Sequence, residues 1–194
     1  MDAEHPARLK VGIIGPGRVG AALGVALTRA GHEVVAVAAV SDTSVQRARE
    51  HFPEAPLAEP AGVVEAADLV LLTVPDDALP GLVAGLAATE APVQGRMLAH
   101  ASGRHGLAVL EPATRLGGLP LALHPVMTFT GRADDVDRLA GTCFGVTAPD
   151  ALRPAAEIPA STALSRSRRC RNVRVRSVDS VLVIPGWPLA TPAL

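Results

Sequence analysis

The sequence predicts an α/β protein in which a parallel sheet is covered by helices on both faces. From Leu9 to about Pro149, short β-branched apolar runs alternate with Ala- and Leu-rich stretches at helical spacing, the pattern of strands buried on both faces. With three Phe, one Trp and no Tyr, the core must be aliphatic, as parallel sheets usually are. A chain of 194 residues holds one such domain and a short appendage.

The predicted elements follow one another along the chain in strand–helix order. The strands are Leu9–Ile14, Glu33–Val40, Asp68–Val74, Arg96–His100, Leu119–His124 and Thr142–Thr147. The helices lie near Gly17–Ala30, Thr43–His51, Pro60–Ala66, Asp76–Ala88 and Gly106–Leu116. Gly31 is placed to cap the first helix at its C-terminus, and Pro75-Asp76-Asp77 begins a later one with acids in its first turn.

A glycine-rich motif connects the first strand to the first helix. The strand runs directly into Gly15-Pro16-Gly17-Arg18-Val19-Gly20, and Ala21–Leu27 continues as a helix, the context that a G-x-G-x-x-G motif needs to bind a dinucleotide. Gly15 allows a tight turn, Gly17 a close approach to the pyrophosphate, and Gly20 close packing of helix on strand. The motif predicts a Rossmann-type parallel sheet that binds NAD or NADP. The alternative is a tight turn without a ligand.

The end of the second strand bears on the choice between NAD and NADP. Asp42 lies 22 residues after Gly20, close to the ~20 expected of an acid that accepts hydrogen bonds from the ribose hydroxyls of NAD. Asp42 is equally well explained as the N-cap of the following helix, and Ser41, Ser44 and Arg47 offer groups for a 2′-phosphate. The sequence leaves the choice between NAD and NADP open.

Three further side chains fall at the carboxyl ends of predicted strands, where open α/β sheets bind ligands. They are His100, Ser102 and His124. An imidazole can pass a proton to a developing alkoxide during hydride transfer, and Ser102 can orient a carbonyl. The alternative is that each histidine satisfies buried backbone groups at a strand end. Asp76 and Asp77 are interpreted as helix caps, and the remaining histidines show no spacing that predicts a metal site.

Composition excludes several classes of partner. A formal net charge of −1 gives no reason to expect nucleic acid or an anionic membrane surface. The N-terminus is acidic where a signal peptide is basic, and no apolar run approaches the ~18–20 residues that span a bilayer. Cys143 and Cys170 make no disulfide framework and no zinc pattern. We therefore predict a cytoplasmic protein without a metal.

The C-terminal segment differs from the rest of the chain. Residues 158–194 carry six Arg and one acid, with Ser clusters, scattered Pro and one short apolar run, Val181–Ile184. We predict an N-terminal arm at residues 1–8, one domain at 9–155 and a disordered tail at 156–194, since no aromatic residue interleaves the arginines as in a nucleic-acid-binding arm. The abrupt change near Glu157, in a chain with 17 Arg and one Lys, suggests a frameshift in GC-rich DNA.

The motifs together resemble a known group of proteins. With the glycine-rich loop, Ala67–Asp77, His100-Ala101-Ser102-Gly103 and His124–Phe129 in these positions, residues 9–155 resemble Rossmann-like proteins that carry a DUF2520 C-terminal domain. That group is related to the 6-phosphogluconate dehydrogenase, pyrroline-5-carboxylate reductase and ketopantoate reductase superfamily. Relatives continue into a helical domain that supplies the dimer interface and much of the substrate pocket, whereas this chain has the Arg-rich tail instead.

The resemblance implies an NAD(P)-dependent oxidoreductase. It places Gly15, Gly17 and Arg18–Gly20 at the pyrophosphate, Thr73-Val74-Pro75 beside the ribose and nicotinamide, and His100, Ser102 and His124 along the substrate cleft. Relatives often have Ser-Arg where this chain has Ser41-Asp42, which weakens an NADP assignment.

The function hypothesis is hydride transfer to or from a small carbonyl or imine, with this chain as the cofactor-binding half. The alternatives are a dinucleotide-binding module without chemistry and an inactive truncated product. The sequence does not predict the substrate, because fold alone does not assign chemistry.

Overall fold

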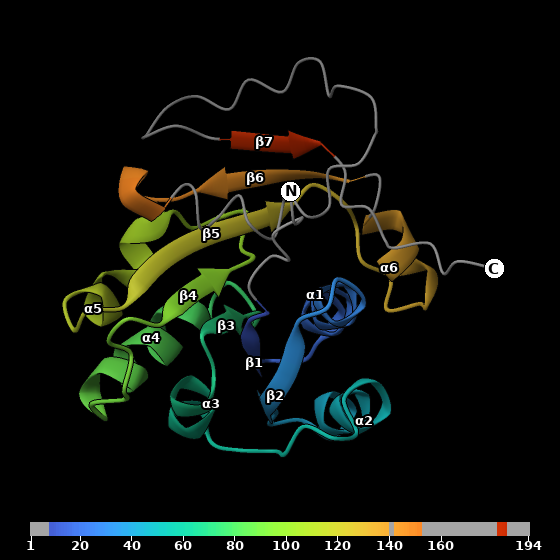
Figure 1. Ribbon diagram of the computed structural model, residues 1–194, viewed down its shortest axis with the longest axis horizontal. Coiled ribbons are helices and arrows are strands. Elements are labelled where there is room, and N and C mark those ends of the chain that lie inside the picture. The colour runs from blue at the N-terminus through green and yellow to red at the C-terminus, as the bar shows by residue number, and fades with distance from the viewer. Residues whose placement is uncertain (1–7, 140–141, 153–181, 186–194) are drawn as a thin grey trace, which may run out of the picture.

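The computed structural model describes residues 8–139, 142–152 and 182–185. Its centre is a seven-stranded sheet in the order β2-β1-β3-β4-β5-β6-β7 (Figure 1). The strands are β1 Lys10–Ile14, β2 Glu33–Ala38, β3 Leu69–Leu72, β4 Met97–His100, β5 Leu119–Pro125, β6 Cys143–Thr147 and β7 Leu182–Pro185. The first five are parallel to one another. The α/β prediction with a Rossmann-type sheet is confirmed.

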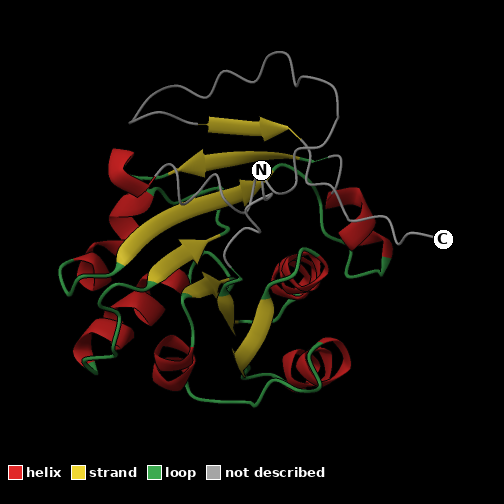
Figure 2. Ribbon diagram, viewed as in Figure 1, coloured by secondary structure: helices red, strands yellow, loops and turns green. Residues whose placement is uncertain are grey.

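Helices cover both faces of the sheet (Figure 2). They are α1 Arg18–Arg29, α2 Asp42–His51, α3 Pro60–Ala66, α4 Leu79–Ala88, α5 Glu111–Thr114 and α6 Asp134–Leu139, with the 3₁₀ turns η1 Leu107–Leu110 and η2 Asp150–Leu152. One core cluster packs α1, α2 and α6 against the sheet. The other packs α3, α4, η1 and α5 against the opposite face. Both clusters are predominantly aliphatic, as the composition predicted.

The sheet order creates a reversal beside β1. The chain leaves β1 through α1 to β2 on one side, then returns to β3 on the other side. The connections therefore diverge at the carboxyl ends of β1 and β3, and a crevice at such a point is where open α/β sheets bind ligands. The glycine-rich motif lies at this point.

The last two strands differ from the predicted all-parallel sheet. β6 pairs antiparallel with β5, and β7 antiparallel with β6. The intervening helix α6 has 6 residues and spans only about 9 Å, whereas the 7 residues of β5 span about 23 Å. Helix α6 therefore covers less than half of the length of β5, and β6 runs in the opposite direction to β5.

β7 lies within the tail for which we predicted disorder. Its four residues, Leu182–Pro185, form the edge strand, so the structure departs from the prediction there. The short apolar run Val181–Ile184, noticed in the sequence, overlaps this strand. The rest of the predicted tail, including the arginine run and the proposed frameshift position at Glu157, lies outside the described residues.

Helix ends account for the other differences. The predicted helix Asp76–Ala88 begins only at Leu79, after a turn in which the Ala78 and Leu79 N–H groups bond to the Pro75 carbonyl. The predicted helix Gly106–Leu116 is divided into η1 and α5, since Pro112 is tolerated only in a first helical turn. Helix α6 was not predicted.

Two other observations bear on the cellular context. None of the helices in the described part of the chain is long and apolar enough to span a bilayer. Cys143, on β6, is disulfide-bonded. This bond departs from the expectation that the cysteines form no disulfide framework, and a cytoplasmic location remains a prediction.

Candidate functional site

The loop after β1 is held against the loop after β3 by backbone contacts. Gly15 has φ +88°, and its N–H donates to the Ala38 carbonyl at 2.9 Å. A Cβ at Gly15 would lie 2.9 Å from Val74 Cγ1 and 3.0 Å from the Val74 nitrogen. Both the left-handed conformation and this close approach require glycine. The turn predicted for Gly15 therefore has a clear steric cause, and Pro16 beside it is buried.

Gly17 and Gly20 have opposite surroundings. A Cβ at Gly20 would lie 2.4 Å from Thr73 Oγ1 and 2.6 Å from the Gly15 carbonyl oxygen, so α1 packs there without room for a side chain. A Cβ at Gly17 would meet only the Gly15 carbonyl oxygen, at 4.0 Å. Gly17 thus presents bare backbone to open space, which is what close approach of a pyrophosphate requires.

The first turn of α1 provides an electropositive surface beside Gly17. Gly17 is the N-cap residue, with no side-chain cap and no acidic residue in the first turn. The first N–H groups of a helix have no intrahelical partner, and the positive end of the helix dipole adds to them. Arg18 is exposed at the first helical position. The residues present therefore fit a dinucleotide pyrophosphate.

Thr73 fixes the glycine-rich loop from the neighbouring strand. Its N–H donates to the Ile14 carbonyl at 2.9 Å, and its hydroxyl donates to the Gly15 carbonyl at 2.7 Å. The resemblance placed Thr73 beside the ribose and nicotinamide. In the structure its hydroxyl proton is used within the protein, so Thr73 supports the loop.

A cavity of about 370 Å³ joins this loop to the ends of β3 and β4. The cavity lies at the reversal between β1 and β3. Residues of the glycine-rich loop and residues that follow β3 and β4 line it together. Its lining consists of Gly17, Arg18, Val19, Leu72, Thr73, Val74, Pro75, Asp76, Ala101 and Ser102. Of the three predicted catalytic residues, this lining includes Ser102 alone.

Hydrogen bonds in the loop after β2 show the role of its polar residues. Ser41 is the N-cap of α2: its hydroxyl accepts from the Ser44 N–H at 3.2 Å, and the Ser44 hydroxyl accepts from the Ser41 N–H at 3.0 Å. The alternative that made Asp42 the N-cap is therefore wrong. Asp42 is the first helical residue, is exposed, and has no side-chain partner among the described residues. Arg47 faces a different cavity, between α1, α2 and α6.

Ser102 is oriented by the turn that follows β4. Its Oγ accepts from the N–H groups of Arg104 at 3.1 Å and His105 at 3.2 Å. Two donors therefore occupy the acceptor sites of the oxygen, and the hydroxyl proton is left to donate to a ligand in the cavity. This geometry suits a group that hydrogen-bonds to a carbonyl oxygen or an imine nitrogen.

His100 is fully buried at the end of β4. Both ring nitrogens lack a hydrogen-bond partner among the residues that the structure describes. Burial lowers the pKa of His100, and the nearby Gly106 backbone and the Asp76 carboxylate offset only part of this effect. No strand-end backbone group among the described residues hydrogen-bonds to the ring, so the alternative explanation for this residue does not hold; the backbone group that acts on the ring is that of Gly106, in the following loop.

His124 is half-buried beneath the loop that follows β4. Its Nδ1 lies 3.3 Å from the Ala101 carbonyl, and a Cβ at Gly103 would meet its Cε1 at 2.6 Å and its Nε2 at 2.9 Å. The ring therefore packs directly under Gly103. The alternative explanation was that the ring satisfies backbone groups at a strand end. It accounts for one ring nitrogen, Nδ1, which lies beside the Ala101 carbonyl.

Sequence reasoning missed two parts of this region. His105, which had no predicted role, places Nε2 3.1 Å from the Asp76 carbonyl and lies close enough to His100 to affect its pKa. Gly131, far along the chain, packs against Arg18. The described residues contain no group of side chains arranged to hold a metal ion.

Comparison with known proteins agrees with this geometry. Residues 2–125 match the family model of the Rossmann-like domain. A Rossmann-type α/β domain is the class that the fold and the glycine-rich loop define, and the chain belongs to the Rossmann-like domain family. No curated protein sequence matches the chain.

Solved structures with a similar fold include several oxidoreductases. An imine reductase variant from Myxococcus stipitatus in complex with NAD⁺ gives a TM-score of 0.62 at 17% identity, covering 79% of this chain and 52% of the other. The pyrroline-5-carboxylate reductase of Coxiella burnetii gives 0.63 at 13% identity, over 80% of this chain and 56% of the other.

The Plasmodium falciparum pyrroline carboxylate reductase with NADP bound gives 0.53 at 11% identity, over 79% and 53%. The chain spans about half the length of these proteins. At these identities the likeness shows the fold; one of these neighbours is in complex with NAD⁺ and another has NADP bound. The DUF2520 resemblance is finer than these comparisons reach and stays a prediction.

Proposed function

We propose that this chain is the cofactor-binding half of an NAD(P)-dependent oxidoreductase that reduces a small carbonyl or imine, or oxidises the corresponding product. The observation that carries the proposal is the cavity of about 370 Å³ that joins Gly17 and Arg18 to Ser102. It connects an anion-binding helix terminus to an oriented hydroxyl, and a dinucleotide needs both ends of such a crevice.

In this proposal the glycine-rich loop binds the pyrophosphate. Gly15 and Gly20 set its shape, Gly17 gives close approach, and the Arg18 guanidinium adds a charged donor. Val74 and Pro75 line the cavity beside the ribose and nicotinamide, where Thr73 acts by holding Gly15. A bound reduced nicotinamide supplies a hydride to the substrate carbon.

The protein then has to complete the reduction with a proton. When a carbonyl or imine carbon receives hydride, its oxygen or nitrogen gains electron density and takes up a proton. The Ser102 hydroxyl donates a hydrogen bond to that atom, and the proton comes from solvent, because neither His100 nor His124 lines the cavity. The His105 N–H donates to Ser102 Oγ at 3.2 Å, and His105 lies close enough to His100 to affect its pKa. We therefore assign His100 a positioning role that acts through His105.

The experiment that tests the proposed pyrophosphate site is titration of the chain with NADH. Gly17→Asp is the test variant. A Cβ at Gly17 meets only one atom, at 4.0 Å, so the fold tolerates the substitution. The new carboxylate would face the pyrophosphate, and we expect the Kd to rise by at least about 100-fold. Gly81→Asp is the control, since it adds the same charge on α4 with nothing within 4 Å. Tight binding by Gly17→Asp would refute the loop assignment.

For the cofactor we propose NAD over NADP. Ser41 and Ser44 are engaged in the helix cap, whereas the exposed Asp42 carboxylate is left to accept from ribose hydroxyls and to repel a 2′-phosphate. Parallel titration with NADH and NADPH tests this. Asp42→Ser should reduce the preference for NADH by about tenfold. A wild-type chain that prefers NADPH would contradict the proposal.

A second candidate is a dinucleotide-binding module without chemistry. It is favoured by the absence of His100 and His124 from the cavity lining. Absorbance of the reduced nicotinamide, followed with a panel of 2-oxo acids and cyclic imines, separates the two. Consumption of the reduced cofactor indicates an enzyme, and binding without consumption indicates a module.

A further inference from the structure

The turn at residues 130–132 lies along the side chain of Arg18. Gly131 has φ +82°, and a Cβ there would lie 3.2 Å from Cγ, 3.4 Å from Cδ and 3.7 Å from Nε of Arg18. The Gly131 backbone therefore supports the arginine stem as far as the guanidinium. A side chain at this position would strain the backbone, and the arginine stem would have to shift by a few tenths of an ångström.

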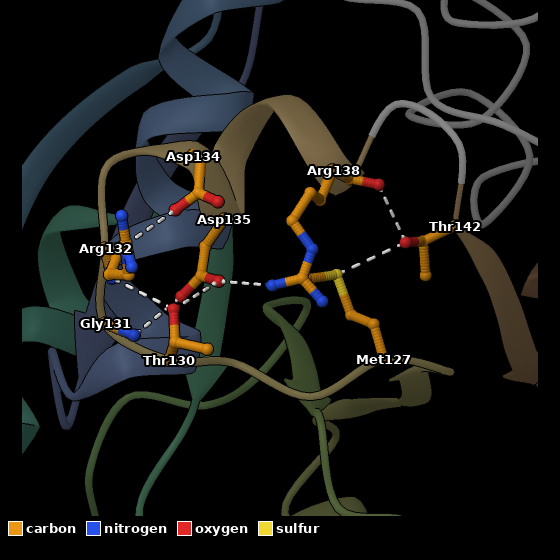
Figure 3. A network of polar contacts seen from close by, with 8 residues as sticks. All are labelled: Met127, Thr130, Gly131, Arg132, Asp134, Asp135, Arg138 and Thr142. Atoms are coloured by element: carbon orange, nitrogen blue, oxygen red, sulfur yellow. Dashed lines mark hydrogen bonds and ion pairs between the residues drawn. The ribbon is translucent and has the colours of Figure 1, made fainter.

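Asp135 holds this turn in place (Figure 3). Its side chain is 1% exposed and accepts from the Gly131 N–H at 2.7 Å and the Thr130 hydroxyl at 3.1 Å. Arg138 donates to the same carboxylate at 3.1 Å. Burial by itself would raise the pKa of Asp135, but these hydrogen bonds and the Arg138 charge hold it below its usual value. The carboxylate is thus charged and fully engaged in fixing the turn.

Helix α6, which carries Asp135, is docked on α1. Val136 and Leu139 are buried in the core cluster that includes α1, and Asp137 pairs with Arg29 at 2.8 Å. That pair is exposed and adds little, so the apolar contacts fix the helix. Residues from Gly131 to Leu139 therefore follow α1 from its first residue towards its last turn.

Arg18 lies between two cavities. It lines the larger one, with the glycine-rich loop, and a smaller one of about 140 Å³ beneath Gly131. Within residues 8–139, 142–152 and 182–185, Arg18 forms no ion pair. Its guanidinium is therefore free for an anionic ligand, while its stem is supported. A supported arginine loses less conformational entropy when it binds.

We infer that Gly131 and Asp135 are positioning residues for dinucleotide binding and act through Arg18. The inference rests on the proposed function, because it assigns the Arg18 guanidinium to the pyrophosphate. Asp135 fixes the turn, the turn fixes the arginine stem, and the arginine meets the phosphates. Neither Gly131 nor Asp135 touches the ligand in this arrangement.

The test uses ADP-ribose, which carries the pyrophosphate without the nicotinamide. Gly131→Ala is expected to raise the Kd of the full chain for ADP-ribose about tenfold, the loss of one charge-assisted contact. Asp135→Asn is expected to act in the same direction, because one carboxylate oxygen and the charge are lost. In an Arg18→Ala background both effects should disappear. A general structural role would lower the affinity equally in both backgrounds and would overturn the inference.

The matched control is Gly31→Ala. Gly31 has φ +92° and nothing within 4 Å of an added Cβ, so it carries the same backbone strain without a contact to Arg18. Its Kd for ADP-ribose should equal that of the wild-type chain. If Gly131→Ala does not fold, as judged by thermal unfolding, Asp135→Asn and the milder Thr130→Val decide the question.

The outcomes separate this inference from the proposed function. A wild-type chain that binds no ADP-ribose refutes both. A wild-type chain that binds it, together with Gly131→Ala and Asp135→Asn that bind equally well, refutes the positioning role alone. Adenosine serves as a second probe: because it lacks the pyrophosphate, its Kd should be the same for the wild-type chain and both variants.

Discussion

The glycine-rich loop and the histidine-containing strand ends lie at the same edge of the sheet but are stabilised differently. The loop is shaped by backbone: Gly15 and Gly20 leave no room for a Cβ, and Thr73 bonds to a main-chain carbonyl. The ends of β4 and β5 are shaped by side chains, and there His100 is buried with no hydrogen-bond partner in the part of the chain that the structure describes. Steric contacts therefore fix the conformation of the glycine-rich loop. The strand ends instead keep buried polar groups that lower the stability of the fold, which is typical of functional sites.

The largest expected effect comes from breaking the steric region. Gly20→Ala places a Cβ 2.6 Å from the Gly15 carbonyl oxygen and 2.4 Å from Thr73 Oγ1, so α1 must move off the loop. We expect the free energy of unfolding to fall by about 3 kcal/mol and NADH binding to be lost. Denaturant unfolding and NADH titration measure the two effects.

Gly85→Ala is the control for this substitution. Gly85 lies in α4 with nothing within 4 Å of an added Cβ, and alanine should stabilise the helix by about 0.5 to 1 kcal/mol. If Gly20→Ala binds NADH with unchanged affinity and stability, the steric account of the loop is wrong.

A substitution in the histidine-containing strand ends should raise the free energy of unfolding instead of lowering it. His100 is fully buried, and an unpaired buried polar group costs about 1 to 3 kcal/mol. His100→Leu should therefore raise the free energy of unfolding by about 1 to 2 kcal/mol, measured by the same denaturant titration. In the proposed enzyme it should also lower turnover.

His32→Leu is the matched control. His32 is also buried, at 5% exposed, but its Nδ1 accepts from the Leu9 N–H at 3.1 Å. Leucine would leave that N–H unpaired, so we expect destabilisation by about 1 to 3 kcal/mol. Stabilisation by both substitutions, or by neither, would mean that the unmet nitrogens of His100 do not set its energy.

The same contrast explains what the sequence could predict. The loop was predictable because glycines at Gly15, Gly17 and Gly20 follow a strand and precede a helix, which is local information. The place of His100 at a strand end was also predictable. Which face of the sheet its side chain occupies was not, because residues in a strand alternate between faces and the register is a tertiary property.

Contacts between distant segments were outside the reach of pattern analysis. Helix α6 is short, and acids fill much of its first turn, so its periodicity is weak. Its docking on α1 brings Gly131 to Arg18 across more than 100 residues of sequence. The antiparallel pairing of β6 with β5 is likewise a contact that local sequence patterns do not encode.

A third prediction concerns pH. Burial lowers the pKa of both His32 and His100 from the usual 6.5, so the unfolded chain takes up these protons at a higher pH than the folded chain does. The free energy of unfolding therefore has its full value, as far as these two histidines are concerned, above pH 6.5, and it decreases as the pH falls below 6.5. Urea midpoints between pH 7.5 and 5.5 measure the slope. His100→Leu should flatten it, and an unchanged slope would show that His100 does not contribute.

The smallest effect on stability is expected at Ser102. Its Oγ accepts from the N–H groups of Arg104 and His105, and since Arg104 is exposed, water can replace much of this bonding. We expect Ser102→Ala to lower the free energy of unfolding by about 0.5 kcal/mol and to leave the Kd for NADH within about twofold. Turnover should fall by more, because the hydroxyl proton faces the cavity. A large loss of NADH affinity with normal stability would instead place Ser102 against the cofactor. The strand ends would then bind the cofactor together with the glycine-rich loop.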